Sequence, residues 1–247
     1  MNLTFVSDLH IADAQSPLYR SLVSLIKDQI QPGDTLVLGG DIFDLFVGNN
    51  TIFKERFAEF LFAVRTAGMR GAHVIYIEGN HDFLLSQVFE GCKGVRVEKE
   101  HARLDLAGKR FYLAHGDLVN ARDFGYRALR AVFRSLPMRL FVSHAPGTWV
   151  DAFGRTCSGA SKKVNRAPDP LLDSRRDNQR AIYREFAGVK FAEGYDFIVM
   201  GHTHVPDECE YKLGDRVGQY INIGYPPENG TVLRWSEGAG KFVRVPA

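Results

Sequence analysis

Cysteine is scarce in this sequence. The three cysteines, Cys92, Cys157 and Cys209, are scattered along the chain, and none pairs with another in a C-x-x-C motif. An odd number of isolated cysteines argues against a disulfide framework and against a structural zinc site. This cysteine usage is typical of a protein from a reducing compartment.

Long apolar runs and a strong net charge are also lacking. No uninterrupted apolar stretch approaches the roughly 20 residues of a membrane-spanning helix. The chain enters a predicted strand at residues 3–6, without the basic start and long apolar core of an export signal. We therefore expect a cytoplasmic protein. The formal net charge is only +2, so no nucleic-acid partner is expected, since dedicated nucleic-acid binders are usually more basic.

The charge is unevenly distributed along the chain. Residues 120–166 contain nine arginines and lysines but only two aspartates, a local excess of seven positive charges. Because the whole chain carries +2, the remainder carries −5. The basic character is therefore confined to one segment.

Short β-branched or aromatic runs alternate with segments of helical periodicity. Strands are predicted at residues 3–7, 35–38, 74–78, 110–114, 197–200 and 220–223. Helical spacing relates Leu18, Leu22, Leu25 and Ile26, and also Phe53, Phe57, Phe60, Leu61 and Val64. This alternation favours an α/β fold. The later strands, in residues 95–114 and 211–245, have little helix between them, which favours a mixed sheet or a two-sheet sandwich.

Residues 122–173 differ from the rest and are interpreted as an insertion between two core strands. Their first half has helical spacing, with arginines predicted opposite an apolar stripe formed by Tyr126, Leu129, Val132, Phe133 and Leu136. Their second half is rich in turn-forming residues. We expect a single domain over residues 1–247 that carries this inserted segment.

Five short blocks contain most of the residues that can bind a metal, and nearly all of them follow a predicted strand. They are Asp8-Leu9-His10, Gly40-Asp41, Gly79-Asn80-His81-Asp82, His115-Gly116-Asp117 and Gly201-His202-Thr203-His204. Such a mixed oxygen and nitrogen set suits manganese, iron or zinc, and ligands collect at the carboxyl ends of strands in α/β sheets. Each block alone is also typical of an ordinary turn. Their order after successive strands favours one metal site over five unrelated loops.

This ordered set resembles the calcineurin-like metallophosphoesterase superfamily. The resemblance implies a four-layer α/β/β/α sandwich with two divalent metal ions between the sheets, most simply Mn²⁺, with iron or zinc as alternatives. One metal would be held by Asp8, His10 and His204. The other would be held by Asn80, His115 and His202, and Asp41 would bridge the two.

The same resemblance implies roles for residues beside the metals. The counterpart of His81 faces the phosphate, where it either stabilises charge or protonates the leaving oxygen. Asp82 would orient His81 or a neighbouring loop. Two interpretations of Asp44 remain open: it bonds to a metal-ligand histidine, or it caps the next turn.

A closer resemblance is to the UDP-2,3-diacylglucosamine pyrophosphatases of lipid A synthesis. It depends on residues 40–48, 79–84, 115–117, 123–126, 177–179 and 201–206. It implies release of UMP and a sugar-lipid 1-phosphate at the cytoplasmic face of the inner membrane, with a helical lid at residues 122–173. Asn80, Asp123 and Tyr126 would then lie near the substrate. That family typically has G-N-R-D, whereas this chain has His81 at the third position, the pattern of the wider superfamily.

Alternatives remain at this stage. The substrate can be another phosphodiester, phosphomonoester or nucleotide, and a non-catalytic interaction protein on the same fold is disfavoured because all seven ligand positions and His81 are present. Apolar residues of the insertion line an acyl-chain groove or form the core between lid helices. They are Leu136, Met138, Leu140, Phe141, Val142, Trp149, Val150 and Phe153. The nearby arginines face a diphosphate or an anionic membrane, or form a solvated surface.

Overall fold

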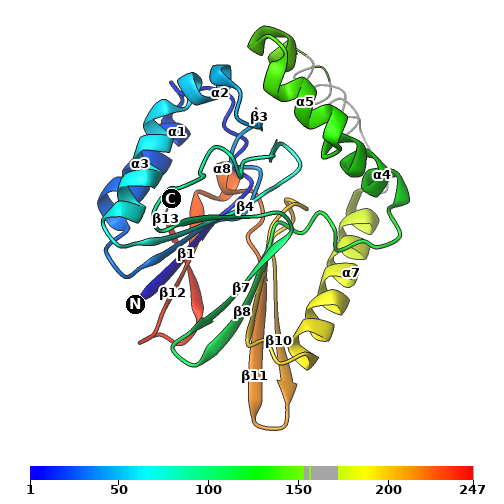
Figure 1. Ribbon diagram of the computed structural model, residues 1–247. Coiled ribbons are helices and arrows are strands. Elements are labelled where there is room, and N and C mark those ends of the chain that lie inside the picture. The colour runs from blue at the N-terminus through cyan, green and yellow to red at the C-terminus, as the bar shows by residue number, and fades with distance from the viewer. Residues whose placement is uncertain (153–155, 157–171, 247) are drawn as a thin grey trace.

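The computed structural model describes residues 1–152, 156 and 172–246 (Figure 1). Two β-sheets lie face to face, and helices cover their outer faces. Within these ranges, no helix combines the length and the apolar character needed to cross a membrane.

The first sheet has six strands in the order β13-β12-β1-β2-β4-β6. Its parallel strands are β1 (Asn2–Val6), β2 (Thr35–Leu38), β4 (His73–Ile77) and β6 (Val95–Glu98). Antiparallel pairing adds β12 (Thr231–Ser236) and β13 (Phe242–Pro246) at one edge. The three strands predicted here are confirmed to within one residue at each end.

The second sheet has five strands in the order β10-β11-β9-β8-β7. They are β7 (His101–Leu106), β8 (Lys109–Ala114), β9 (Phe197–Met200), β10 (Asp207–Leu213) and β11 (Arg216–Asn222). β8, β9 and β11 are parallel, and hairpins add β7 and β10 at the edges. A short parallel ladder joins β3 (Phe46–Val47) to β5 (Asp82–Phe83). The expected two-sheet sandwich is confirmed.

Helices occupy the two outer faces (Figure 1). Against the first sheet lie α1 (Pro17–Ser24), which continues as the π-helix η1 (Leu25–Gln29), and α3 (Ala58–Met69), preceded by α2 (Thr51–Arg56). Against the second sheet lies α7 (Leu172–Ala192), and a short helix α8 (Pro226–Asn229) precedes β12. The predicted spacing from Phe53 to Val64 is divided between α2 and α3, because Phe57 leaves the helical region with φ −113° and ψ 30°.

Side-chain alternation along the strands produces the layers. In β8, Phe111 and Leu113 face the first sheet, while Tyr112 and Ala114 face α7. In β1, Leu3 and Phe5 likewise lie between the sheets. Buried apolar residues of the described chain form three clusters, one under each helical layer and one between the sheets. The four-layer α/β/β/α fold is therefore confirmed.

Between β8 and α7 the chain forms α4 (Phe124–Phe133) and α5 (Leu136–His144). The apolar stripe predicted opposite the arginines is divided in the structure, because Tyr126 shares a face with Arg130 and Arg134. Leu129, Val132 and Leu136 are exposed by 52%, 58% and 67%, while Arg130 and Arg134 point inward. The arginines face inward because buried carboxylates lie beneath the helix and need positive partners.

The apolar residues of α5 and the turn after it are divided between interior and surface. Val142 and Val150 are buried in the first helical layer, whereas Leu136, Leu140 and Trp149 are exposed. The Nδ2 of Asn50 donates a hydrogen bond to the carbonyl of Val142 at 3.0 Å. This segment is therefore packed against the core along one side only. Phe153, the last apolar residue predicted to belong to this set, lies outside the described residues.

Candidate metal centre

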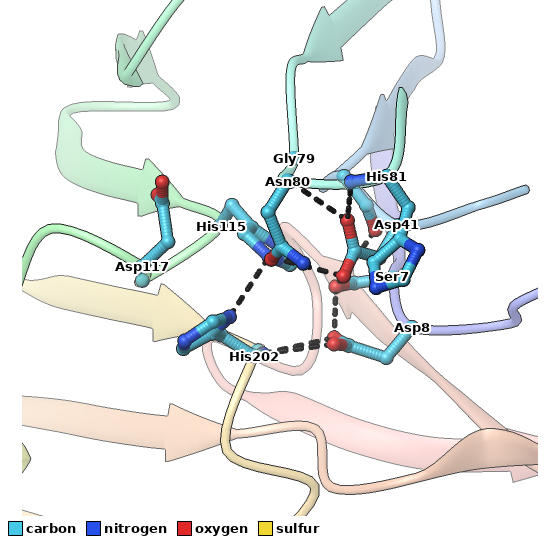
Figure 2. A network of polar contacts seen from close by, with 12 residues as sticks. Ser7, Asp8, Asp41, Gly79, Asn80, His81, His115, Asp117 and His202 are labelled. Carbon is cyan, nitrogen blue, oxygen red and sulfur yellow. Dashed lines mark hydrogen bonds and ion pairs between the residues drawn. The ribbon is translucent and has the colours of Figure 1, made fainter. Parts of the chain in front are cut away.

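The seven predicted ligand residues meet at the carboxyl ends of strands from both sheets. Asp8, Asp41 and Asn80 follow β1, β2 and β4, and His115 and His202 follow β8 and β9. A chain of contacts shorter than 4 Å connects these residues with His10 and His204. Figure 2 shows the side chains of Asp8, Asp41, Asn80 and His115 turned toward one another.

The first donor group consists of Asp8, His10 and His204. The Nε2 atom of His204 lies 3.0 Å from Nε2 of His10 and 3.4 Å from Oδ1 of Asp8. Two ring nitrogens that face each other beside a carboxylate present more lone pairs than protons when the rings are neutral. A cation between them satisfies all three groups, so this donor chemistry fits a metal.

The second donor group consists of Asn80, His115 and His202. Nε2 of His115 lies 3.0 Å from Oδ1 of Asn80 and 3.2 Å from Nδ1 of His202. Nδ1 of His115 lies 3.0 Å from the carbonyl oxygen of Gly39, which can only accept a hydrogen bond. In the neutral ring Nε2 therefore carries a lone pair and no proton, and it faces another acceptor, Oδ1 of Asn80. This arrangement also fits a metal ligand whose orientation is fixed by the backbone.

Asp41 lies between the two donor groups. Its Oδ1 accepts hydrogen bonds from the backbone N–H groups of Asn80 and His81, each at 2.9 Å. Its Oδ2 lies 3.8 Å from Nε2 of His10 and 3.5 Å from Nε2 of His115. One oxygen thus fixes the carboxylate, and the other faces both groups.

The electrostatics of the site favour a cation. Burial alone would lower the pKa of His115, but the carboxylates of Asp41, Asp8 and Asp117 raise it to about 10. Burial lowers the pKa of His10 to about 4, so that ring is neutral at pH 7 and can act as a ligand. The buried carboxylates therefore favour positive charge at this place, which the protonated His115 supplies in the metal-free protein, while His10 is neutral.

The backbone of the site is strained. Five of the seven ligand residues adopt left-handed φ angles: Asp8 56°, His10 47°, Asp41 52°, His202 71° and His204 57°. Such a conformation costs of order 1 kcal/mol or more at a non-glycine residue, and it concentrates at functional sites. The strain turns short side chains from separate strands toward one point.

Two glycines of the predicted blocks are required by close approach. A Cβ atom on Gly79 would lie 2.2 Å from Oδ1 of Asp41, and one on Gly201 would lie 2.0 Å from Oδ2 of Asp8. Neither carboxylate has space to retreat, because each is already bonded to backbone N–H groups. Any side chain at these positions would displace a ligand.

His81 and Asp82 occupy different environments. Nδ1 of His81 lies 3.0 Å from the carbonyl oxygen of Asp44, and its ring meets the ring of His10 edge-on at 4.9 Å. Asp82 is fully buried and accepts bonds from the backbone N–H groups of Asp41 and Ile42 at 2.8 and 2.7 Å. Of the two roles predicted for Asp82, this geometry fits the orientation of a neighbouring loop.

Asp44 lies near two histidines of the site. Its Oδ1 is 3.7 Å from Nδ1 of His10, which is beyond hydrogen-bond distance, while its backbone carbonyl lies near His81. The side chain therefore faces a candidate ligand without the hydrogen bond that the first interpretation of this residue requires, so neither interpretation is decided.

The residues predicted to contact substrate lie at the start of α4. Asp123 is exposed, and its side chain caps the helix by accepting from the N–H of Tyr126 at 2.9 Å. The hydroxyl of Tyr126 donates to Oδ2 of Asp117 at 2.6 Å, and its ring centre lies 6.0 Å from that of His202. Tyr126 therefore borders the second donor group, with Asp123 farther out.

Two residues of the site were missed by sequence reasoning. The hydroxyl of Ser7 donates to Oδ2 of Asp8, and the ring of Tyr225 stacks on His204 with centroids 4.7 Å apart. Their signals were present: Ser7 directly precedes a ligand, and Tyr225 follows β11 at the same edge of the second sheet.

A search among known protein families supplies the context. The calcineurin-like phosphoesterase family matches residues 1–206. The chain belongs to this family. It is a metal-dependent hydrolase, and the two donor groups are its candidate site for divalent metal ions.

Individual relatives agree with this family. The UDP-2,3-diacylglucosamine hydrolase of Aeromonas salmonicida is 27% identical, over 96% of this chain and 91% of its own length. The protein of the same name from Xanthomonas campestris pv. campestris is 28% identical, over 95% of each chain. Among solved structures, an archaeal phosphodiesterase aligns over all of both chains at 13% identity, with a TM-score of 0.46.

Proposed function

We propose that this phosphoesterase hydrolyses the diphosphate of a UDP-diacylglucosamine-like nucleotide-sugar lipid. The products would be UMP and a sugar-lipid 1-phosphate. The observation that carries this proposal is the position of α4, whose Tyr126 borders the second donor group. A substrate at the metals must lie against this helix. The names and nearly full-length similarity of the relatives support the same substrate.

The proposed metals are two divalent ions, most simply Mn²⁺, with iron or zinc as alternatives. Asp8, His10 and His204 would hold one, Asn80, His115 and His202 the other, and Oδ2 of Asp41 would bridge them. When bound, such ions polarise the phosphoryl oxygens and offset the charge that develops during displacement.

His81 is proposed as the group that donates a proton to the leaving oxygen. Its Nδ1–H is directed to the carbonyl of Asp44, which leaves Nε2 as the atom that holds and moves the catalytic proton. Asp82 would keep the Asp41 loop in place through its two backbone contacts. Asn80, Asp123 and Tyr126 would contact the substrate.

The inserted segment is proposed to form a lid on a single domain and to approach the cytoplasmic face of a membrane; of its predicted range 122–173, residues 153–155 and 157–171 lie outside the described residues. Six large apolar side chains of this segment are exposed by at least 52%: Phe124, Leu129, Val132, Leu136, Leu140 and Trp149. Arg122 and Arg139 are exposed in the same segment. Apolar surface beside basic residues suits an anionic lipid surface.

His81 favours a second candidate function. Since the lipid A family typically has arginine at this position, the chain can be a phosphoesterase for another phosphodiester or nucleotide. An assay of the Mn²⁺-loaded protein separates the two functions. It compares UDP-diacylglucosamine, UDP-glucose and a small aryl phosphodiester, with the Asp41→Asn variant as the inactive control.

The first function predicts a kcat/KM for the acylated substrate about 100-fold or more above that for UDP-glucose, because the acyl chains add binding contacts. Equal values for the two nucleotide sugars, or a preference for the aryl diester, would favour the second function.

A further inference from the structure

Arg134, the residue that caps the C-terminal end of α4, contacts the residues that precede Asn80. One terminal nitrogen of its guanidinium donates to Oε2 of Glu78, and Nη2 donates to the carbonyl oxygen of Gly79 at 2.8 Å. Both side chains of this ion pair are shielded from solvent, with 14% of Arg134 and 1% of Glu78 exposed. A helix of the inserted segment is thus bonded to the residue directly before a candidate metal ligand.

Glu78 closes the loop that carries Asn80 and His81. Its Oε1 accepts a hydrogen bond from the backbone N–H of Leu85 at 2.7 Å, across the base of that loop. A buried carboxylate in this place needs a positive partner, and Arg134 supplies it. The position of α4 therefore influences the conformation of the loop that carries Asn80 and His81.

Arg130 makes a similar pair of contacts, to the loop that carries His115 and to the backbone of Lys99. Its Nε donates to Oδ2 of Asp117 at 2.8 Å, and its Nη2 donates to the carbonyl oxygen of Lys99 at 2.8 Å. Asp117, which is 6% exposed, also accepts the hydroxyl of Tyr126. Asp117 lies two residues after His115, so this helix and its C-terminal end contact two of the three loops that supply the second donor group, those of Asn80 and His115.

These contacts come from one face of the helix, since Tyr126, Arg130 and Arg134 are spaced by four residues. A buried ion pair is seldom more stabilising than apolar residues of similar size. If these two positions were needed only for packing, leucine or methionine would stabilise the fold as well as arginine does. Two such pairs lie near candidate ligands of the same donor group. They indicate that the positions of Asn80 and His115 must be fixed.

We propose that Arg134 and Arg130 are positioning residues that fix Asn80 and His115, so that α4 sets the geometry of the second metal position. This inference rests on the proposed dinuclear site and is independent of the substrate. It assigns the inserted segment a part in metal binding in addition to any contact with substrate.

Calorimetric titration of the metal-free protein with Mn²⁺ tests the proposal. Arg134→Met should weaken one of two binding events by about 10- to 100-fold, the usual effect of removing a contact behind a metal ligand. Arg134→Lys should give an intermediate loss, since one ammonium cannot replace the fork that reaches two partners. Arg127→Met is the matched control: it removes one charge from an exposed position of α4 and should leave both events unchanged.

Reference variants identify the weakened event. It should be the one lost in His115→Ala and retained in His204→Ala. Turnover of the small aryl diester should fall in kcat with little change in KM, a division that a purely structural role does not predict.

The inference is overturned if Arg134→Met leaves Mn²⁺ binding unchanged, or if it weakens both events in step with the thermal midpoint. Should Arg134→Met fail to fold, Arg134→Lys gives the same decision. Arg134→Met can show the selective loss of Mn²⁺ binding while the parent protein does not hydrolyse UDP-diacylglucosamine. In that case the positioning role of Arg134 stands and the proposed substrate is wrong.

Discussion

The two carboxylate oxygens of Asp41 have separate environments. Oδ1 is fixed by two backbone N–H groups, and Oδ2 faces a histidine from each donor group. Burial alone would raise the pKa of Asp41, but His115, His81 and His10 hold it well below its usual range. The side chain is therefore an anion in the metal-free protein, as the proposed bridging role requires.

Asp41→Asn should distinguish the backbone contact of Oδ1 from the proposed metal contact of Oδ2. The amide can keep an oxygen for the backbone N–H groups of Asn80 and His81 while placing an uncharged NH₂ toward the metals. We expect at least one of two Mn²⁺ ions to be lost and activity to fall by about 100-fold or more. Elemental analysis after dialysis measures the metal. Two ions retained in an active variant would contradict the bridging role.

His81→Ala should retain its metal and lose turnover. A positioned acid–base group typically contributes about 100-fold or more to the rate, and the donor groups are complete without His81. Metal content and kcat should be measured on one preparation. Loss of metal in proportion to activity would make His81 a ligand. His81→Arg is a second probe: higher activity on the nucleotide-sugar lipid would mark a relative with an altered substrate.

The candidate ligand residues were indicated by their places after predicted strands, and the family resemblance supplied their division into two groups. The contacts behind them could not be predicted. The contact of Ser7 with Asp8 depends on a left-handed φ at Asp8, which composition and spacing do not reveal. Tyr225 depends on β11 lying next to β9, a pairing that periodicity does not specify.

At the scale of elements, α4 shows what amphipathicity can and cannot predict. The alternation of arginines with apolar residues correctly indicated a helix with two unlike faces. The predicted stripe is nevertheless divided in the structure, because Tyr126 lies on the same face as Arg130 and Arg134. Asp117 and Glu78 are buried carboxylates beneath the helix. The helix positions that face them therefore need a cationic side chain, which arginine provides.

The exposed side of the same segment predicts binding to lipid. Arg122→Gln with Arg139→Gln should reduce partition into anionic vesicles, since each basic residue near such a surface adds about 1 kcal/mol. Partition should also fall as salt rises, because screening acts over about 8 Å at 0.15 M ionic strength. Co-sedimentation with anionic and neutral vesicles measures both effects.

A companion variant addresses the apolar contribution. Leu129→Gln with Val132→Gln should lower partition at high salt as well, where charge contributes least. Both variants should hydrolyse the small aryl diester at the parental rate. If both also bind anionic vesicles as the parent does, the exposed face of this segment is an ordinary solvated surface.

At the scale of the whole molecule, the architecture was predicted more completely than its details. Alternating strands and helices indicated the α/β class, and the resemblance supplied the four layers. The sandwich matters for function because the donor groups draw on both sheets: His115 and His202 follow strands of one, and Asp8, Asp41 and Asn80 follow strands of the other. The site therefore depends on how the sheets are packed.

Acid should weaken the metal-free fold through Asp117. Burial alone would raise its pKa, but His115 and His202, with Tyr126 and Arg130, lower it. Because the folded-state pKa is the lower one, the carboxylate stabilises the fold fully above the unfolded value, about 3.9. That contribution is lost as the pH falls through the folded value.

Asp117→Asn should therefore lower the free energy of unfolding at pH 7 by about 3 kcal/mol, the cost of leaving a buried partner charge uncompensated. The difference from the parent should shrink only below about pH 4. Urea unfolding at several pH values measures it. Asp105→Asn, at an aspartate whose side chain is 83% exposed, is the control and should change little. A difference that is constant down to pH 3 would exclude this linkage.

The distance along the chain between the ligands has a consequence for biosynthesis. The backbone N–H of His202 bonds to the carboxylate of Asp8 across 194 positions of sequence. A ribosome has therefore made more than four-fifths of the chain before Asp8, which follows the first strand, can meet His202. The nascent protein cannot complete either metal position until β9 has emerged and paired. Acquisition of the proposed metals is then a late event, and a chain interrupted before residue 202 would have Asp8 and Asp41 without His202 and His204 beside them.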